Sequence, residues 1–127
     1  MTTGLNKKRV LAVDDAKDWV EVVKFHLEAN DFEVITAYDG REALAKAREV
    51  KPDLILLDVM LPHLSGFEVC RLLKFDKNFR NIPVVLLTSR NSEGDRAIGR
   101  QVGANEYISK TNFLENAIEK VLELTRN

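Results

Sequence analysis

The sequence contains little cysteine and no long apolar run. A single cysteine among 127 residues excludes an internal disulfide and a cysteine-rich metal site. No apolar stretch approaches the ~20 residues of a membrane-spanning helix, and the first residues lack the apolar segment of a signal peptide. We therefore expect no membrane insertion, and we predict a cytoplasmic location.

The chain also lacks an excess of charge of either sign. It carries 19 basic and 20 acidic side chains, for a net charge of −1. Without a broad positive field, direct binding of nucleic acid is not expected. The one basic run, residues 7–9, comes just before the first apolar stretch. We expect residues 1–8 to form a solvated leader and residues 9–127 to form one domain.

Five short apolar runs, rich in leucine and β-branched residues, recur along the chain. They span residues 10–13, 34–37, 54–57, 84–87 and 107–108. Several do not alternate with polar residues, which is typical of strands buried on both faces of a parallel sheet. Stretches with helical periodicity lie between them. The alternation predicts an α/β fold of five βα units, with helices on both faces of the sheet.

On the first predicted helix, apolar residues at helical spacing define the face toward the core. These residues are Trp19, Val22, Val23 and Leu27. A second set, Ala16, Val20 and Lys24, recurs every four residues and is predicted to form an exposed stripe. Val20 would then offer an apolar contact to a helical partner.

Local signals predict where two further helices begin. Asp39 with Glu42 and Ser65 with Glu68 both have the spacing of a capping box. The lone Cys70 follows the second of these boxes, among apolar residues at helical spacing. We expect it to be a small core residue.

Four of the five apolar runs end at or just before a polar residue of reactive type. These residues are Asp14 with Asp15, Asp58, Thr88 and Lys110. The carboxyl ends of parallel strands meet at one edge of a sheet, and sites form beyond that edge. We therefore expect these side chains to converge there.

The converging residues favour chemistry on a phosphoryl group. Three carboxylates without a cation would repel one another, and Mg²⁺ is the hard cation that such oxygens bind. Lys110 and Thr88 would supply a positive charge and a hydroxyl donor to phosphate oxygens. A carboxylate can itself be the nucleophile and become an aspartyl phosphate. Asp58 suits that role because it closes the central predicted strand.

These residues, taken in order, resemble the response-regulator receiver family of two-component signalling. The pattern reads Asp14-Asp15, then Asp58-Val-Met-Leu-Pro62 with Ser65-Gly66, then Thr88-Ser89, then Tyr107 with Lys110. The resemblance spans nearly the whole chain. It implies the flavodoxin-like (βα)5 receiver fold, with strand order 2-1-3-4-5. It also implies a signalling switch, not an enzyme in the ordinary sense, which assists its own phosphorylation and dephosphorylation.

The resemblance further implies the roles of the acidic residues. Asp58 resembles the phosphoacceptor, which receives its phosphoryl group from the phosphohistidine of a histidine kinase or phosphotransfer protein. Asp15 looks like a direct Mg²⁺ ligand, and Asp14 like a ligand through a bound water. The backbone carbonyl of Met60 matches a further metal ligand.

The remaining matches imply a switch that controls a downstream protein or effector domain. Lys110 is similar to the lysine that binds the phosphoryl group, and Thr88 to the hydroxyl that moves toward it. Tyr107 matches the aromatic residue that swings inward after Thr88 has moved. Gly66 fits the family's turn into the third helix.

The chain departs from the family pattern directly after Lys110. The family usually has a proline there, often after a cis peptide, whereas this chain has Thr111. A cis bond before a non-proline residue costs about 2.5–4 kcal/mol, so we expect trans. Thr111 or Asn112 is predicted to cap the last helix instead.

Two residues near the acceptor bear on how long the phosphorylated form lasts. Met60 and Arg90 stand two positions after Asp58 and two after Thr88. Neither can act as a base toward water. We expect slow hydrolysis.

Three other functions can be weighed against the same residues. A receiver-like scaffold that works without phosphorylation would be expected to lose an acidic residue or the lysine, and none is lost. A flavodoxin-like cofactor binder would need a loop rich in Gly, Ser and Thr after the first strand. The loop here begins Asp14-Asp15 and would repel a phosphate. An aspartyl phosphatase would carry a second carboxylate where Met60 stands.

Overall fold

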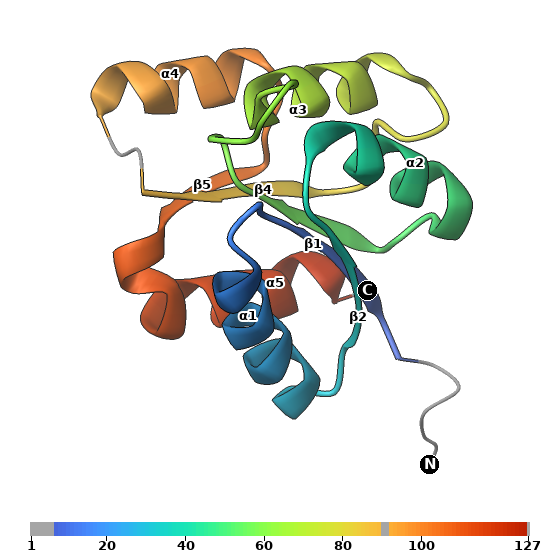
Figure 1. Ribbon diagram of the computed structural model, residues 1–127, viewed down its shortest axis with the longest axis vertical. Coiled ribbons are helices and arrows are strands. Elements are labelled where there is room, and N and C mark those ends of the chain that lie inside the picture. The colour runs from blue at the N-terminus through green and yellow to red at the C-terminus, as the bar shows by residue number, and fades with distance from the viewer. Residues whose placement is uncertain (1–6, 90–91, 127) are drawn as a thin grey trace.

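The structure is a computed structural model that describes residues 7–89 and 92–126. Five parallel strands form one sheet in the order β2-β1-β3-β4-β5, which confirms the predicted topology (Figure 1). The strands are β1 (Arg9–Val13), β2 (Glu33–Ala37), β3 (Leu54–Leu57), β4 (Val84–Thr88) and β5 (Glu106–Ser109). Each includes the apolar run from which it was predicted.

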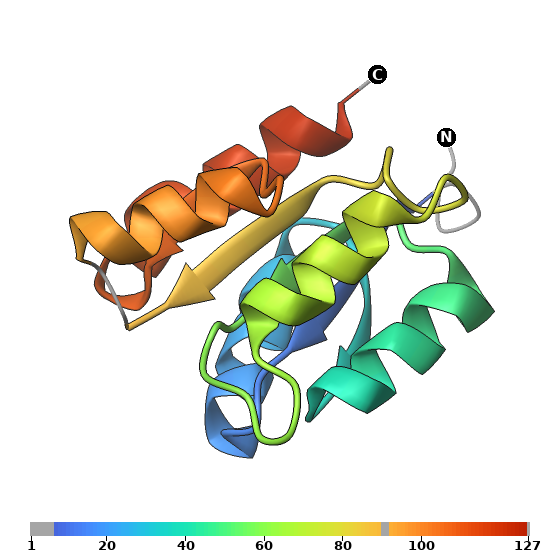
Figure 2. The ribbon, with the colours of Figure 1, turned by 90° about the horizontal axis from the view of Figure 1, so that it is seen from above.

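Helices cover both faces of the sheet. Those after the first four strands are α1 (Lys17–Ala29), α2 (Gly40–Val50), α3 (Gly66–Phe75) and α4 (Glu93–Gln101). After β5 come a 3₁₀ turn η2 (Lys110–Asn112), a π-helical segment η3 (Phe113–Ala117) and α5 (Ile118–Thr125). Helices α1 and α5 lie on one face, and α2, α3 and α4 lie on the other (Figures 1 and 2).

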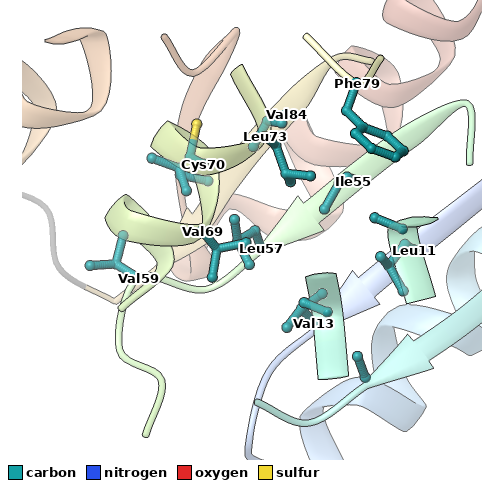
Figure 3. Packing of buried hydrophobic residues seen from close by; sticks show 14 residues of the cluster. Leu11, Val13, Ile55, Leu57, Val59, Val69, Cys70, Leu73, Phe79 and Val84 are labelled. Atoms are coloured by element: carbon teal, nitrogen blue, oxygen red, sulfur yellow. The ribbon is translucent and has the colours of Figure 1, made fainter. Parts of the chain in front are cut away.

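Alternate residues of each strand feed two separate cores. In β1, Leu11 and Val13 face α2 and α3, whereas Val10 and Ala12 face α1 and α5. Figure 3 shows the first core, in which strand residues meet the side chains of α3. Cys70 is fully buried in this core, as predicted. Every residue of β3 and β4 is buried, so these central strands carry no polar face.

Helix α1 is rotated from the predicted orientation. Val20 is only 1% exposed and packs with Val23 and Leu27, while Val22 is 42% exposed. The prediction that Val20 forms an exposed contact is therefore wrong. Positions 20, 23 and 27 make as good a helical stripe as the predicted one. Because 20 and 22 are both valine, periodicity alone did not choose between them.

The helix starts agree with the capping signals in α2 and α3. The Asp39 side chain accepts a hydrogen bond from the Glu42 amide, and Ser65 with Glu68 forms a complete capping box. The segment after Lys110 differs from expectation. It has trans peptides, as predicted, but Thr111 and Asn112 cap no helix through their side chains.

Ser109 provides the cap in this segment instead. Its hydroxyl accepts a hydrogen bond from the Thr111 amide at 3.2 Å and lies 2.8 Å from the Thr111 hydroxyl. The side chain that ends β5 thus turns the chain directly into η2, and no proline is needed. The turn begins at Lys110, so its geometry sets where the lysine side chain starts.

Gly66 allows α3 to begin against the loop that follows β3. A Cβ built at this position would lie 2.1 Å from the Asp58 carbonyl oxygen and 2.8 Å from Val59 Cα. Both neighbours are backbone atoms that no rotamer change can move. The Gly66 amide also donates to the Val59 carbonyl at 2.9 Å. Glycine is therefore required here for close approach and not for an unusual backbone angle.

Gly66→Ala is expected to destabilise the protein strongly, by about 2 kcal/mol or more, because backbone must shift to admit the methyl group. Gly94→Ala is the matched control, since a Cβ there meets only Ser92 Oγ at 3.8 Å. In exposed helix the control should gain up to about 1 kcal/mol. Urea unfolding of both variants measures this. Equal effects of the two substitutions would contradict the close-approach argument.

Candidate functional site

The carboxyl ends of four strands bring the predicted polar residues together. Asp14 follows β1, Asp58 follows β3, Thr88 ends β4 and Lys110 follows β5. Asp14, Asp58 and Thr88 are at most 5% exposed, whereas Asp15 faces solvent. One carboxylate oxygen from each of the three aspartates lies within 4.8 Å of the others. The sheet edge therefore carries a compact acidic cluster with one open side.

The Lys110 ammonium is the positive charge inside this cluster. Its Nζ lies 2.7 Å from Asp14 Oδ2 and 3.5 Å from Asp58 Oδ2. The remaining oxygen of Asp14 accepts a hydrogen bond from the Ala16 amide at 2.9 Å. The amide holds Asp14 against the start of α1. The lysine thus spans two carboxylates that belong to neighbouring strands.

One lysine does not balance the cluster. Burial raises the pKa of Asp58 above its ordinary value of 3.8, and the nearby charge of Asp14 raises it further. Lys110, the Thr88 hydroxyl and the Met60 amide act against this rise, because each stabilises the ionised carboxylate. The carboxylate of Asp58 is therefore held in a site that is short of positive charge.

The donor set fits a hard divalent cation. Asp58 Oδ1 is buried and accepts no hydrogen bond from the described residues. Asp15, on the exposed side of the cluster, has room to approach a cation that enters from solvent. Mg²⁺ takes oxygen ligands and keeps several waters, which suits a cluster open on one side. The Met60 amide stabilises the ionised Asp58 carboxylate, and the Met60 side chain is 53% exposed. The Met60 carbonyl remains a predicted metal ligand.

Tyr107 packs against α4. The Arg96 guanidinium sits 5.3 Å from the centre of the Tyr107 ring and donates to its carbonyl oxygen at 3.2 Å. A Cβ on Gly99 would lie 2.9 Å from the same ring. The small residue at 99 therefore makes the space that the ring occupies. The sequence around Gly99 does not indicate this contact, because a helical pattern carries no information about the ring of Tyr107.

Sequence reasoning also missed Trp19 as part of the site. The Lys110 Nζ lies 5.4 Å from the centre of the Trp19 ring. The position of Trp19, one turn after the acidic pair, was a usable signal, but the residue was assigned to the core. Arg90, the predicted neighbour of Thr88, lies outside the described residues.

With this geometry in view, the comparisons with known proteins decide the family. Residues 10–122 match the family model described as the response regulator receiver domain. The chain belongs to the response-regulator receiver family. Receiver domains of this family are signalling switches of two-component systems. In the part of the chain described, no helix is long and apolar enough to cross a membrane.

Named relatives agree with this assignment. The chain is 46% identical over 103 residues to the alkaline phosphatase synthesis transcriptional regulatory protein PhoP of Bacillus subtilis. It is 45% identical over 118 residues to the response regulator PleD of Caulobacter vibrioides. These matches cover 81% and 93% of this chain, but only 42% and 26% of the relatives. The chain thus spans less than half the length of either.

Solved receiver structures superpose closely on the fold. The chemotaxis protein CheY4 of Vibrio cholerae has a TM-score of 0.86 at 33% identity, covering 93% of this chain and 98% of that one. The response regulator TrrA of Thermotoga maritima, solved with Mg²⁺ and a beryllium fluoride, has a TM-score of 0.83 at 32% identity. That match covers 92% of this chain and 98% of the other.

Asp58→Asn is expected to raise the Tm of the metal-free protein at neutral pH. The folded pKa of Asp58 lies above the ordinary 3.8, so the folded state holds this proton more tightly. Wild-type stability therefore falls as pH rises from 3.8 through the folded pKa. The amide removes that loss. Thermal melts in chelator at several pH values measure the gain.

The gain should shrink as pH falls through the folded pKa of Asp58 and vanish below 3.8, where Asp58 is protonated in both states. Asp31→Asn is the control, because the Asp31 side chain is 84% exposed and asparagine tolerates its positive φ of 71°. It should change the Tm little at any pH. A lower Tm for Asp58→Asn, or a gain that does not vary with pH, would contradict the strained charge balance.

Proposed function

We propose that this chain accepts a phosphoryl group on Asp58 in an Mg²⁺-dependent reaction, and that the donor is the phosphohistidine of a histidine kinase or phosphotransfer protein. The observation that carries the proposal is the buried Oδ1 of Asp58, beside Asp14 and Lys110, which accepts no hydrogen bond from residues 7–89 and 92–126. A hydrogen-bonded structural carboxylate would not leave that oxygen free. A scaffold that works without phosphorylation has no use for it.

The proposed transfer follows from the charges at the sheet edge. An Asp58 oxygen attacks the phosphorus, an O–P bond forms and the N–P bond to the donor imidazole breaks. The imidazole nitrogen leaves with the electron pair and takes up a proton. Lys110 and the Thr88 hydroxyl, which both stabilise the ionised Asp58 carboxylate, would hold phosphoryl oxygens. When bound, Mg²⁺ neutralises charge on the carboxylates and the phosphoryl group; Asp15, Asp58 and Met60 would hold it directly and Asp14 through water.

Thr88 and Tyr107 form the proposed switch that controls a downstream partner. Thr88 is fully buried at the end of β4, and its hydroxyl lowers the pKa of Asp58 by stabilising the ionised carboxylate. In the neighbouring strand β5, Tyr107 pairs with Leu86, two residues before Thr88. A hydroxyl that moves toward a phosphoryl group frees space toward Tyr107. The phosphoryl group drives this change only if it interacts better with the moved arrangement.

Phosphorylation should map to Asp58 and should require Mg²⁺. Incubation with acetyl phosphate, followed by peptide mass spectrometry, is expected to show one added phosphoryl group at this residue. Chelator should abolish the labelling, because the acidic cluster repels the donor without a cation. Asp53→Asn removes an exposed carboxylate near the opposite end of β3 and should be labelled normally. If Asp58→Asn were labelled as strongly as the wild type, the assignment of Asp58 as the phosphorylated residue would be contradicted.

The phosphohistidine donor is expected to dock on α1, beside the acidic pair. With Val20 buried, the most exposed large apolar side chain on this helix is Phe25, at 68% exposure, ahead of Val22 at 42%. Phe25→Ser should slow transfer from a phosphorylated histidine phosphotransfer domain by about fivefold or more, if the ring is a contact of ordinary strength. Labelling by acetyl phosphate should not change.

Phe75→Ser is the matched control for docking. Phe75 is 89% exposed and lies on α3, across the sheet from α1. Its loss should leave both reactions unchanged. Docking on α1 would be refuted if the two serine variants slowed transfer equally, or if Phe25→Ser left it at the wild-type rate.

The phosphorylated form is expected to be long-lived. The Met60 side chain stands at the exposed side of the acceptor and cannot orient an attacking water by a strong hydrogen bond. Met60→Asn should speed the loss of phosphate severalfold, and Met60→Asn with Arg90→Glu should speed it further. Decay after removal of the donor measures the rate. Unchanged decay in the double variant would exclude water positioning by these residues.

The remaining assignments stay predictions from the sequence. They are the cytoplasmic location, the absence of direct nucleic-acid binding and the boundary between a leader of residues 1–8 and a receiver domain of residues 9–127. Residues 1–6 lie outside the described part of the chain.

A further inference from the structure

The active-site lysine contacts an aromatic side chain that the proposed chemistry does not use. Trp19 lies on the first turns of α1, and its ring centre is 5.4 Å from Lys110 Nζ. Trp19 is the only tryptophan in the chain. The Lys110 side chain is 21% exposed, so the ring meets the ammonium in a partly desolvated place. An ammonium at this distance from an indole face is attracted to its negative charge density.

The same ring is anchored to the segment that follows the lysine. Trp19 packs edge-on against Phe113, with ring centres 5.5 Å apart, and Phe113 is 2% exposed in η3. His26, about two turns further along α1, also packs edge-on against Phe113, with ring centres 5.9 Å apart. Phe113 stands three residues after Lys110, beyond the turn that Ser109 caps. The ring of Trp19 therefore touches both the lysine head group and the backbone segment that carries it.

A positioning device is useful at this point of the chain. Lys110 is held by two aspartates at 2.7 and 3.5 Å, and both are the carboxylates that a cation and a phosphoryl group would engage. When those partners change, the lysine loses ion pairs that fix its place. No proline stiffens the backbone directly after it. A neutral aromatic face keeps its attraction for the ammonium whatever the charge of the cluster.

We propose that Trp19 is a positioning residue for Lys110, holding the ammonium at the acceptor edge through its ring face and the lysine-bearing segment through Phe113. The inference rests on the proposed function, in which Lys110 binds the transferred phosphoryl group. A small cavity with about 10 Å³ of free volume lies beside the ring, lined by Trp19, Asp14 and Asp58 among others. That is at most room for one water, so the indole fills the space beneath the carboxylates and keeps it nearly dry.

The contact itself is tested without phosphorylation. In NMR spectra of the metal-free protein, the ε-methylene protons of Lys110 should be shifted upfield by the indole ring current. Trp19→Leu should return them to ordinary lysine positions. If the wild-type shifts are ordinary, or if Trp19→Leu leaves them unchanged, the contact does not exist and the proposal fails. This readout does not depend on whether Asp58 accepts phosphate.

The consequence is tested by labelling rates with acetyl phosphate at saturating Mg²⁺. Trp19→Leu should slow labelling about three- to fivefold, the factor that a cation–π contact of ordinary strength supplies. Trp19→Phe should recover part of that rate because it keeps an aromatic face. In a Lys110→Ala background, Trp19→Leu should cause no further loss. Equal losses in both backgrounds would make Trp19 a packing residue only.

Two further variants keep the test decisive. Tyr38→Leu removes a ring whose centre lies 5.4 Å from Lys17 Nζ, the same distance as between Trp19 and Lys110. Lys17 is exposed and lies outside the acidic cluster, so this variant should leave labelling unchanged. If Trp19→Leu does not fold, Phe113→Leu should lower the rate in the wild-type background and not in Lys110→Ala. A wild-type chain that is never labelled refutes the proposed function, while the lysine shifts still decide the role of Trp19.

Discussion

Two carboxylates lie buried side by side at the end of a sheet and need positive charge, and among the described residues one ammonium lies close to both. Lys110 lies 2.7 Å from Asp14 and 3.5 Å from Asp58, and burial with the charge of Asp14 still raises the pKa of Asp58. The site therefore carries more negative than positive charge. If nearby positive charges fully neutralised the two carboxylates, neither binding of a cation nor reaction with a phosphoryl group would be favoured.

The sheet makes the imbalance possible by bringing distant residues to one edge. In the parallel register Val13 lies opposite Leu57, and the next residues along the two strands are Asp14 and Asp58. The four buried residues of β3 and the five of β4 leave these strands no freedom to slip, since a shift would expose apolar side chains. Gly66 lets α3 press against the Asp58 backbone from one side. Stability of the core is thus what holds like charges together.

Much of this was predictable because strand ends and helix starts carry strong local signals. Apolar runs without polar alternation gave the five strands, and reactive residues after them gave the acidic cluster. The family resemblance supplied the strand order and the proposed roles. The roles of Trp19 and Gly99 were missed, because each acts through a residue of another element, Lys110 and Tyr107 respectively.

Other errors have the same physical origin. Residues 20 and 22 are both valine, so only the way in which α1 packs on the sheet decides which of them is buried. The segment after β5 is capped by Ser109, the residue before the lysine, because its hydroxyl accepts a hydrogen bond from the Thr111 amide. The side chains of Thr111 and Asn112 cap no helix. Periodicity and propensity report on one element at a time, whereas these outcomes depend on contacts between elements.

Calorimetric titration with Mg²⁺ tests the charge balance most directly. If Lys110 and the cation compete for the same carboxylates, Lys110→Ala should bind Mg²⁺ more tightly than the wild type, and Asp14→Asn should bind it more weakly. An exposed lysine such as Lys77, changed to alanine, should have little effect. Weaker Mg²⁺ binding by Lys110→Ala, with Asp14→Asn unchanged, would contradict the account.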